Sequence, residues 1–85
     1  MNILFYTGFK ASPTLGGVEH ATISIAYGLR NKYGCRCFSA YHIERDTSMV
    51  DCFEAEYVWN DFKQTDGIIR FCRDNDIILL FPDAE

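Results

Sequence analysis

Residues 2–34 decide the fold, and they read NILFYTGFKASPTLGGVEHATISIAYGLRNKYG. The first six of them, residues 2–7, are almost continuously apolar and rich in β-branched and aromatic side chains. Such a run predicts a central strand that is buried on both faces, as in a parallel sheet. Residues 8–17 contain three glycines, one proline and two hydroxyl residues, so we expect the strand to end there in a loop.

A helix is predicted directly after this loop. From Val18 onward, apolar residues recur at spacings of three and four, which is the pattern of one buried helix face. The positions that form this pattern are Val18, Ala21, Ile25, Ala26, Leu29 and Tyr33. Arg30 and Lys32 occupy the last turn, where cations complement the helix dipole, and Gly34 stands where a left-handed cap would end the helix.

The remaining sequence continues the alternation of strands and helices. Residues 35–42, 55–59 and 77–81 are predicted strands, and the last of them, apolar throughout, is expected to be buried like the first. A second helix is expected after a cap at Asn60 or Asp61, with its apolar positions at Phe62, Ile68, Ile69 and Cys72. The chain is therefore predicted to be an α/β protein, a partial Rossmann-like three-layer unit with a mainly parallel sheet and the order strand-helix-strand-strand-helix-strand. The order of strands within the sheet stays open, because the second-to-third connection lacks a helix.

Length and composition limit the functional classes. The 85 residues, 48% of them hydrophobic, suffice for one unit spanning residues 1–85 and leave no room for a second domain. Eight basic residues against twelve acidic ones give a net charge of −4 without a basic run, which argues against nucleic acid as a partner. No apolar segment is long enough to cross a bilayer and no secretory signal is evident, so we expect a cytoplasmic protein.

Four cysteines, at positions 35, 37, 52 and 72, have poor spacing for a zinc site. Cys35 and Cys37 are two apart on a predicted strand, so their side chains should share one face. We therefore expect reduced thiols that pack in the core, with neither a metal nor a cofactor.

The segment Gly16-Gly17-Val18-Glu19 is the candidate binding site. In open parallel sheets, ligands bind at the carboxyl ends of the strands, and this segment joins the first strand to the first helix. Two glycines let a ligand approach the backbone, and the free N–H groups of the first helical turn attract phosphate or hydroxyl oxygens. The segment has neither the spaced glycines of a dinucleotide site nor the Gly-Lys-Ser or Gly-Lys-Thr of a P-loop. Glu19 can also simply stabilise the helix dipole.

These features together resemble the amino terminus of GT-B-type retaining glycosyltransferases, more narrowly the glycosyltransferase family 4 or group 1 family. The resemblance rests mainly on residues 1–34: the opening strand, the loop ending in Gly16-Gly17-Val18-Glu19-His20, and the segment Lys32-Tyr33-Gly34. It covers the whole chain only in the order of elements.

What the resemblance implies is transfer of a sugar from a nucleotide-diphosphate sugar, the donor substrate, to a sugar or lipid-linked acceptor. Residues 1–85 would form the N-terminal part of the N-terminal domain and would contribute the glycine loop and the acceptor side of the cleft. Gly16 and Gly17 would approach the donor, while Val18 and Glu19 would begin the helix that points at it. The chain would be catalytically incomplete alone, its catalytic residues stay unknown, and any peripheral membrane association would belong to the full enzyme.

An alternative is a small α/β binding or interaction module that works through self-association at its sheet edge or through a protein partner. Among the other candidates, His20 is expected to face solvent and His42 to lie in a strand-end loop. Glu44 and Asp46 occupy the position of a ribose-binding acid but lack the glycine fingerprint. The aromatic residues Tyr57 and Trp59 favour core packing over stacking on a sugar or base.

Overall fold

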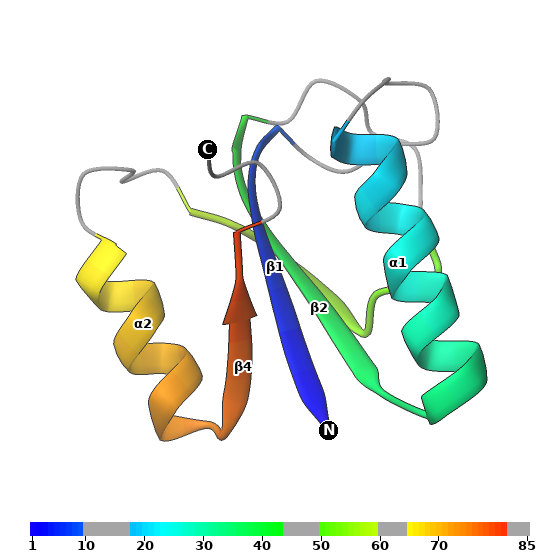
Figure 1. Ribbon diagram of the computed structural model, residues 1–85. Coiled ribbons are helices and arrows are strands. Elements are labelled where there is room, and N and C mark those ends of the chain that lie inside the picture. The colour runs from blue at the N-terminus through cyan, green and yellow to red at the C-terminus, as the bar shows by residue number, and fades with distance from the viewer. Residues whose placement is uncertain (10–17, 44–49, 60–64, 82–85) are drawn as a thin grey trace.

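The structure of the protein is a computed structural model in which residues 1–9, 18–43, 50–59 and 65–81 are described. It is an α/β unit in three layers, with a four-stranded parallel sheet between two helices (Figure 1). The elements, in chain order, are β1 (Asn2–Phe9), α1 (Val18–Tyr33), β2 (Arg36–Ile43), β3 (Ala55–Val58), α2 (Thr65–Asp74) and β4 (Ile77–Leu80). The predicted fold class and chain order are confirmed.

The sheet order is β3-β2-β1-β4, which the sequence had left open. Helix α1 connects neighbouring strands on one face, and α2 crosses back past β2 and β1 on the other face before β4 begins. Each helix thus covers its own face, as right-handed crossovers require. Strands β2 and β3 are parallel neighbours without a helix between them, and residues 52 and 53 of their connection are buried on the α1 face.

Strand β1 is buried on both faces, as its apolar run predicts. Ile3 and Phe5 pack under α1, whereas Leu4 and Tyr6 pack under α2. This follows from the two-residue alternation of side chains in a strand that has a neighbour on each side.

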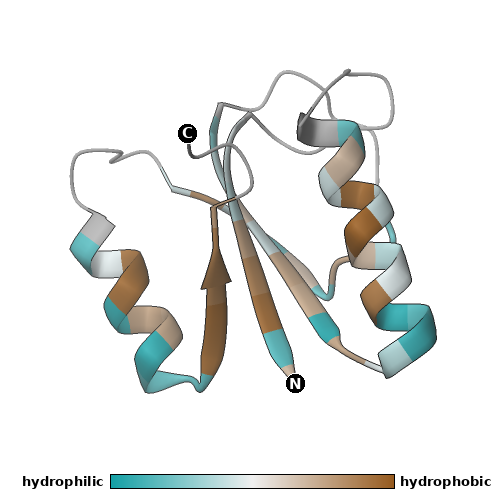
Figure 2. Cartoon of the chain, in the orientation of Figure 1, coloured by the Kyte–Doolittle hydropathy of each residue, from teal (hydrophilic) through white to brown (hydrophobic). Residues whose placement is uncertain are grey.

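Strand β4 corrects one prediction. Its continuous apolar sequence was interpreted as a buried strand, yet it is the last strand of the sheet in the described part of the chain. Ile77 and Leu79 are half-buried under α2, but Ile78 and Leu80 on the opposite face are 46% and 38% exposed. Figure 2 shows β4 as apolar along its length although it lies at an edge.

Helix α1 begins at Val18 and ends at Tyr33, as predicted. Gly34 follows with φ 68°, and its N–H donates to the Arg30 carbonyl while the Cys35 N–H donates to the Leu29 carbonyl. This is the predicted left-handed cap, which satisfies two carbonyls at the helix end.

The buried face of α1 agrees only in part with the predicted one, since Ala26 is buried and Leu29 packs against the core as expected. Thr22, Ile23 and Ala26 are buried, whereas Ile25 and Tyr33 are 49% and 68% exposed and Ala21 is exposed as well. The difference arises because the apolar spacing fits two adjacent helix faces, and only contact with the sheet selects between them. In α2, Ile68 and Cys72 are buried as predicted, while Ile69 is exposed; the expected cap and Phe62 lie outside the described residues.

Candidate functional site at the carboxyl edge of the sheet

The strand order locates the place where a ligand would bind. Strand β1 lies between β2 and β4. The chain leaves β1 toward β2, whereas it enters β4 from β3. In parallel sheets the crevice opens outside the carboxyl ends of such a strand pair. The amino-terminal ends of α1 and α2 lie at this same edge (Figure 1). The N–H groups of two helix starts, which have no acceptor within their own helix, therefore lie at the edge where β1 and β4 end.

The predicted site residues are only partly described. Gly16 and Gly17 lie outside the described residues, and Val18 and Glu19 are the first two residues of α1. Their backbone N–H groups belong to the first helical turn, which has no intrahelical acceptors. The predicted helix start at this edge is therefore confirmed, whereas a role in ligand binding stays a prediction.

Tyr6 and His42 form a hydrogen-bonded pair near the carboxyl ends of β1 and β2. The Tyr6 hydroxyl lies 3.0 Å from His42 Nε2, and the ring centroids are 5.3 Å apart. Phe81 follows β4, and its ring centroid lies 5.7 Å from that of Tyr6. Tyr6 is buried and His42 is half-buried, so the pair reaches from the interior to the surface at this edge.

Sequence reasoning missed this pair. His42 was expected in a strand-end loop, but it is the seventh residue of β2 and shares the α2 face with Tyr6. What brings the two residues together is the parallel register of β1 and β2. In this register Tyr6 pairs with Ala40, and His42 follows two residues later on the same face of the sheet. That register could not be derived before the strand order was known.

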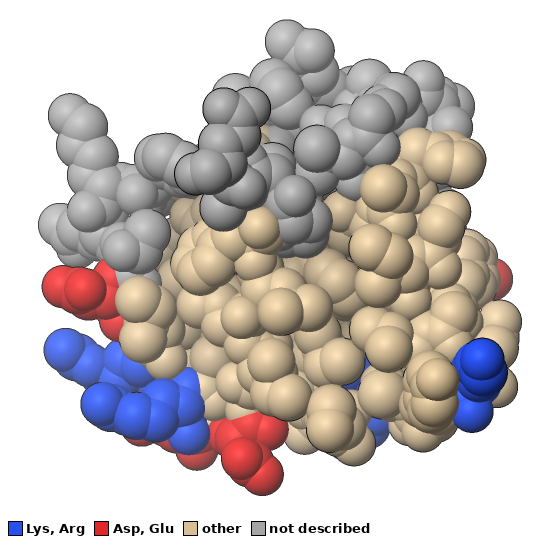
Figure 3. Space-filling model, viewed as in Figure 1, with Lys and Arg blue, Asp and Glu red and all other residues tan. Residues whose placement is uncertain are grey.

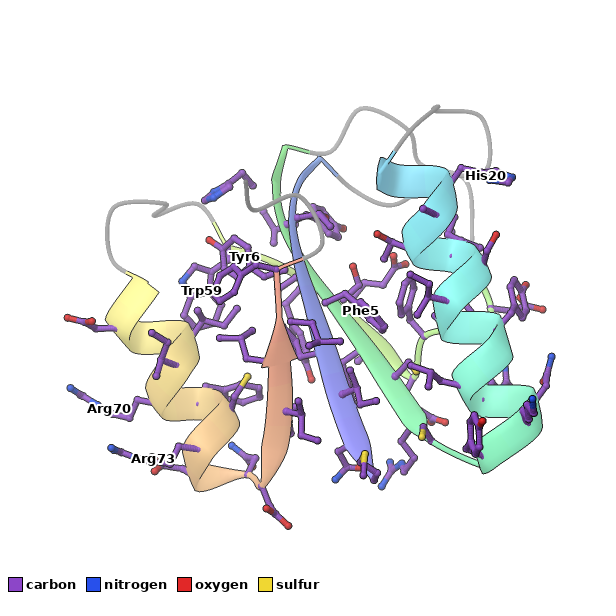
Figure 4. The ribbon with its side chains drawn as sticks, in the orientation of Figure 1. Phe5, Tyr6, His20, Trp59, Arg70 and Arg73 are labelled. Carbon is purple, nitrogen blue, oxygen red and sulfur yellow. The ribbon has the colours of Figure 1, made fainter. Side chains whose placement is uncertain are left out.

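The other candidate residues from the sequence lie apart from this pair or outside the described residues. His20 is exposed in the first turn of α1 and points away from the sheet (Figure 4), as expected. Trp59 and Tyr57 pack against the core on the α2 face, where the ring centroids of Tyr57 and Phe71 are 5.8 Å apart. Their predicted core role is confirmed. Glu44 and Asp46 lie outside the described residues.

The face of the sheet under α1 carries buried polar groups that the sequence analysis did not single out. Thr7, Thr22 and Ser39 are at most 1% exposed. Glu56 is half-buried and lies beside Ser39 in the register of β2 and β3. The Ser39 hydroxyl has no hydrogen-bond partner among the residues that the structure describes. A buried hydroxyl without a hydrogen-bond partner costs stability.

All four cysteines are buried with free thiols, as their predicted core role requires. Cys35 and Cys37 share the α1 face, and the Cys37 thiol donates to the Ala26 carbonyl at 3.8 Å. Burial raises the pKa of the Cys52 thiol to about 11 and also raises the pKa of the Cys37 and Cys72 thiols. Since the thiolate is the nucleophile and the metal ligand, these three thiols are poor candidates for either role at neutral pH.

Charged side chains gather away from the centre of the face shown in Figure 3. Arg70 and Arg73 lie on α2 at one side, where Figure 4 shows them pointing away from the sheet, and the surface between the two helices is uncharged. Within the described ranges, no cluster of His, Cys, Asp and Glu could hold a metal ion. The two described helices are also too short or too polar to cross a membrane.

No protein-family model, curated protein or solved structure matches this chain.

Proposed function

We propose that the chain is the N-terminal part of a cytoplasmic glycosyltransferase that uses a nucleotide-diphosphate sugar. In this role it contributes the glycine loop and the acceptor side of the cleft and is not a complete catalyst. The observation that carries the proposal is the start of α1 at Val18, directly after the Gly16-Gly17 loop and at the carboxyl edge of a parallel sheet. The proposal also rests on the resemblance of residues 1–34 to that family.

The physical chemistry of sugar transfer supports this assignment. The diphosphate gains negative charge as the glycosidic bond of the donor breaks. Fixed N–H donors at a helix start stabilise such charge without having to reorganise, so they act on the transition state. A neighbouring pair of glycines leaves space for a bulky donor against the backbone. Tyr6 and His42, at the same edge, would lie within the acceptor side of such a cleft.

A titration of the chain with nucleoside diphosphates, followed by amide chemical shifts, tests the binding role. We expect the amides of residues 16–19 to shift at millimolar ligand. The amides of residues 65–68 serve as an internal control, because α2 also begins at this edge but does not follow paired glycines. Gly17→Val should suppress the shifts. Unmoved amides at residues 16–19, or equal shifts at both helix starts, contradict a dedicated phosphate site.

The gene itself tests the assignment to a larger enzyme. We expect the reading frame to continue beyond Glu85 for about 200 or more residues, enough for a second Rossmann-like domain. That domain should carry two spaced glutamates, as the family resemblance implies. A stop codon directly after Glu85 would contradict the enzyme for this chain.

The second candidate is a binding module that works through association. It is favoured by the exposure of Ile78, Leu80 and Phe81, which are 46%, 38% and 41% exposed at the β4 edge. Contiguous exposed apolar side chains at a sheet edge are typical of an interaction surface.

A further inference from the structure

We infer that β4 pairs antiparallel with β4 of a second copy, joining two sheets into one across a two-fold axis. The inference rests on the second candidate function and names its partner and geometry. The surface involved, called the β4 edge surface here, consists of β4 with the flank of each helix that faces it. Its exposed members are Ile25, Asp66, Ile69, Arg73, Ile78 and Leu80.

Strand β4, residues 77–80, carries no charged or proline side chain of the kind that keeps natural sheet edges apart. Natural edge strands are blunted by charged side chains, especially Lys, by Pro, or by bulges. Strand β4 is Ile-Ile-Leu-Leu and carries no charge. The opposite edge differs, because β3 contains Glu56 and its Val58 is followed by the half-buried Trp59. Of the two edge strands that the structure describes, only β4 is free of charged residues.

The apolar surface continues from β4 onto α1. Tyr27 donates from its hydroxyl to the Asp51 carboxylate, and the Arg30 guanidinium donates to the Asp51 carbonyl at 2.6 Å. These contacts turn that flank of α1 toward the residues that lead into β3. Ile25 projects from the other flank, because it lies about 100° from Ala26 in the direction opposite to Tyr27. The exposed Ile25 side chain thus lies on the flank nearer Ile78 and Leu80.

Helix α2 presents a charged and apolar flank on the same side. Phe71 contacts Tyr57, and a Cβ at Gly67 would lie 3.1 Å from the Trp59 ring, so one flank of α2 faces β3. Residues on the other flank, at helical spacing, are Asp66, Ile69 and Arg73. Ile69 at the centre of this flank is 47% exposed, and Arg73 at its end points away from the sheet (Figure 4).

The order of residues on this flank is self-complementary. It runs from an acid through an apolar centre to a base, so an antiparallel copy would place Asp66 beside Arg73 of the second copy. Arg73 already lies 3.6 Å from Asp74 in an exposed ion pair, so Asp66 would join or replace that partner. Within one helix the two residues are seven positions apart, about 10.5 Å along the axis, and cannot pair with each other. A two-fold axis makes the same contact twice, which is how isologous dimers form.

The strands can align in the same arrangement. If the axis passes Leu79, Ile78 lies opposite Leu80 of the second copy on the α1 face. Side chains that oppose each other on one face of an antiparallel pair interact directly. In this dimer, the uncharged surface between the helices in Figure 3 would lie in the interface between the two copies.

Sedimentation equilibrium of the 85-residue chain tests the dimer. We expect a monomer–dimer equilibrium at submillimolar concentration, with Leu80→Lys or Ile78→Lys weakening it by about tenfold or more. Val58→Lys, an exposed apolar residue on the opposite edge strand, is the matched control and should leave it unchanged within about twofold. Circular dichroism checks that each variant is folded. A wild-type monomer at the highest concentration, an open-ended series of larger species, or equal loss in Val58→Lys would each overturn the inference.

A charge exchange tests the antiparallel arrangement. Asp66→Lys and Arg73→Glu should each weaken the dimer, and the double variant should recover it, since the two new charges would meet across the axis. A double variant no stronger than the weaker single variant would overturn the helix contact. A longer gene product that is monomeric, with its later residues paired to β4, would overturn the whole inference.

The diphosphate titration can be repeated on the monomeric Leu80→Lys variant, so the two proposals fail independently. Shifted amides at residues 16–19 in a chain that never dimerises would remove the second candidate and keep the glycosyltransferase assignment.

Discussion

The two faces of the sheet are built from different chemistry. Under α2, the core consists of Leu4, Tyr6, Ala40, Ile68 and Cys72, with further aromatic rings packed against it. Under α1, Ile3 and Phe5 share the interior with Thr7, Thr22 and Ser39. The helices differ in the same way, since the buried residues of α2 are Ile68 and Cys72, whereas α1 buries the polar Thr22 beside Ile23 and Ala26. One sheet thus has a face held mainly by apolar burial and another on which polar groups must be satisfied.

The largest expected effect comes from the α2 face. Ile68→Ala should lower the free energy of unfolding by about 2–5 kcal/mol, because Ile68 is fully buried and its loss leaves a cavity. Urea denaturation measures the effect. Ile69→Ala is the control at the next position, where the side chain is 47% exposed, and should cost much less. Equal losses at the two positions would contradict the assigned buried face of α2.

The α1 face should lose stability in alkaline solution through Cys52. Its pKa is raised by burial to about 11, above the ordinary value of 9.0, so the unfolded chain ionises first as pH rises. The free energy of unfolding is therefore unaffected below pH 9 and falls between about pH 9 and 11, by roughly 1.4 kcal/mol per unit of pKa difference.

Urea denaturation at pH 8 and pH 10.5 measures this loss. Cys52→Ala should remove its share of the pH dependence, while the other thiols with raised pKa keep theirs. A variant with the same pH dependence as the wild type would show that Cys52 does not ionise in this range.

The end of α1 provides a smaller test. Gly34→Ala should destabilise the protein by about 1–2 kcal/mol, because φ at this position is 68° and a Cβ is strained there. A Cβ at Gly34 would meet no atom within 4 Å among the described residues, so the effect reports the backbone alone. Asp76 also has positive φ, 56°, and Asp76→Gly should have a small effect of the opposite sign. Both are measured by thermal and urea unfolding.

The smallest expected effect is a gain on the α1 face. Ser39→Ala should leave the free energy of unfolding unchanged or raise it by up to about 1 kcal/mol, because the hydroxyl is buried without a described partner. If urea denaturation shows that the free energy of unfolding falls by more than about 1 kcal/mol, this hydroxyl has a hydrogen-bond partner. The two faces of the sheet would then differ less in how well their buried groups are satisfied.

Local patterns predicted the elements well where the signal is carried by neighbouring residues. The apolar run of β1, the helix start at Val18 and the cap at Gly34 all follow from residue type and spacing. The exposure of Ile25 and Tyr33 in α1 and of one face of β4 was not predicted. Both depend on which side of an element meets the sheet, and an apolar residue such as Ile25 or Leu80 is compatible with either environment.

The candidate site shows the same division. The helix start at Val18 was located from sequence, whereas Gly16 and Gly17 lie outside the described residues and their binding role stays a prediction. The Tyr6–His42 pair was not located from sequence, since its members are 36 positions apart and meet only through the parallel register of β1 and β2.

The sequence by itself determined the fold class, the chain order of strands and helices, and the cap that ends α1. Each of these depends on interactions within a few residues. Only the tertiary structure decided the sheet order, the polar lining under α1 and the exposed apolar edge of β4. Those properties arise from contacts between distant segments, and the free energy of such contacts depends on the packing of the whole sheet rather than on any one stretch of residues.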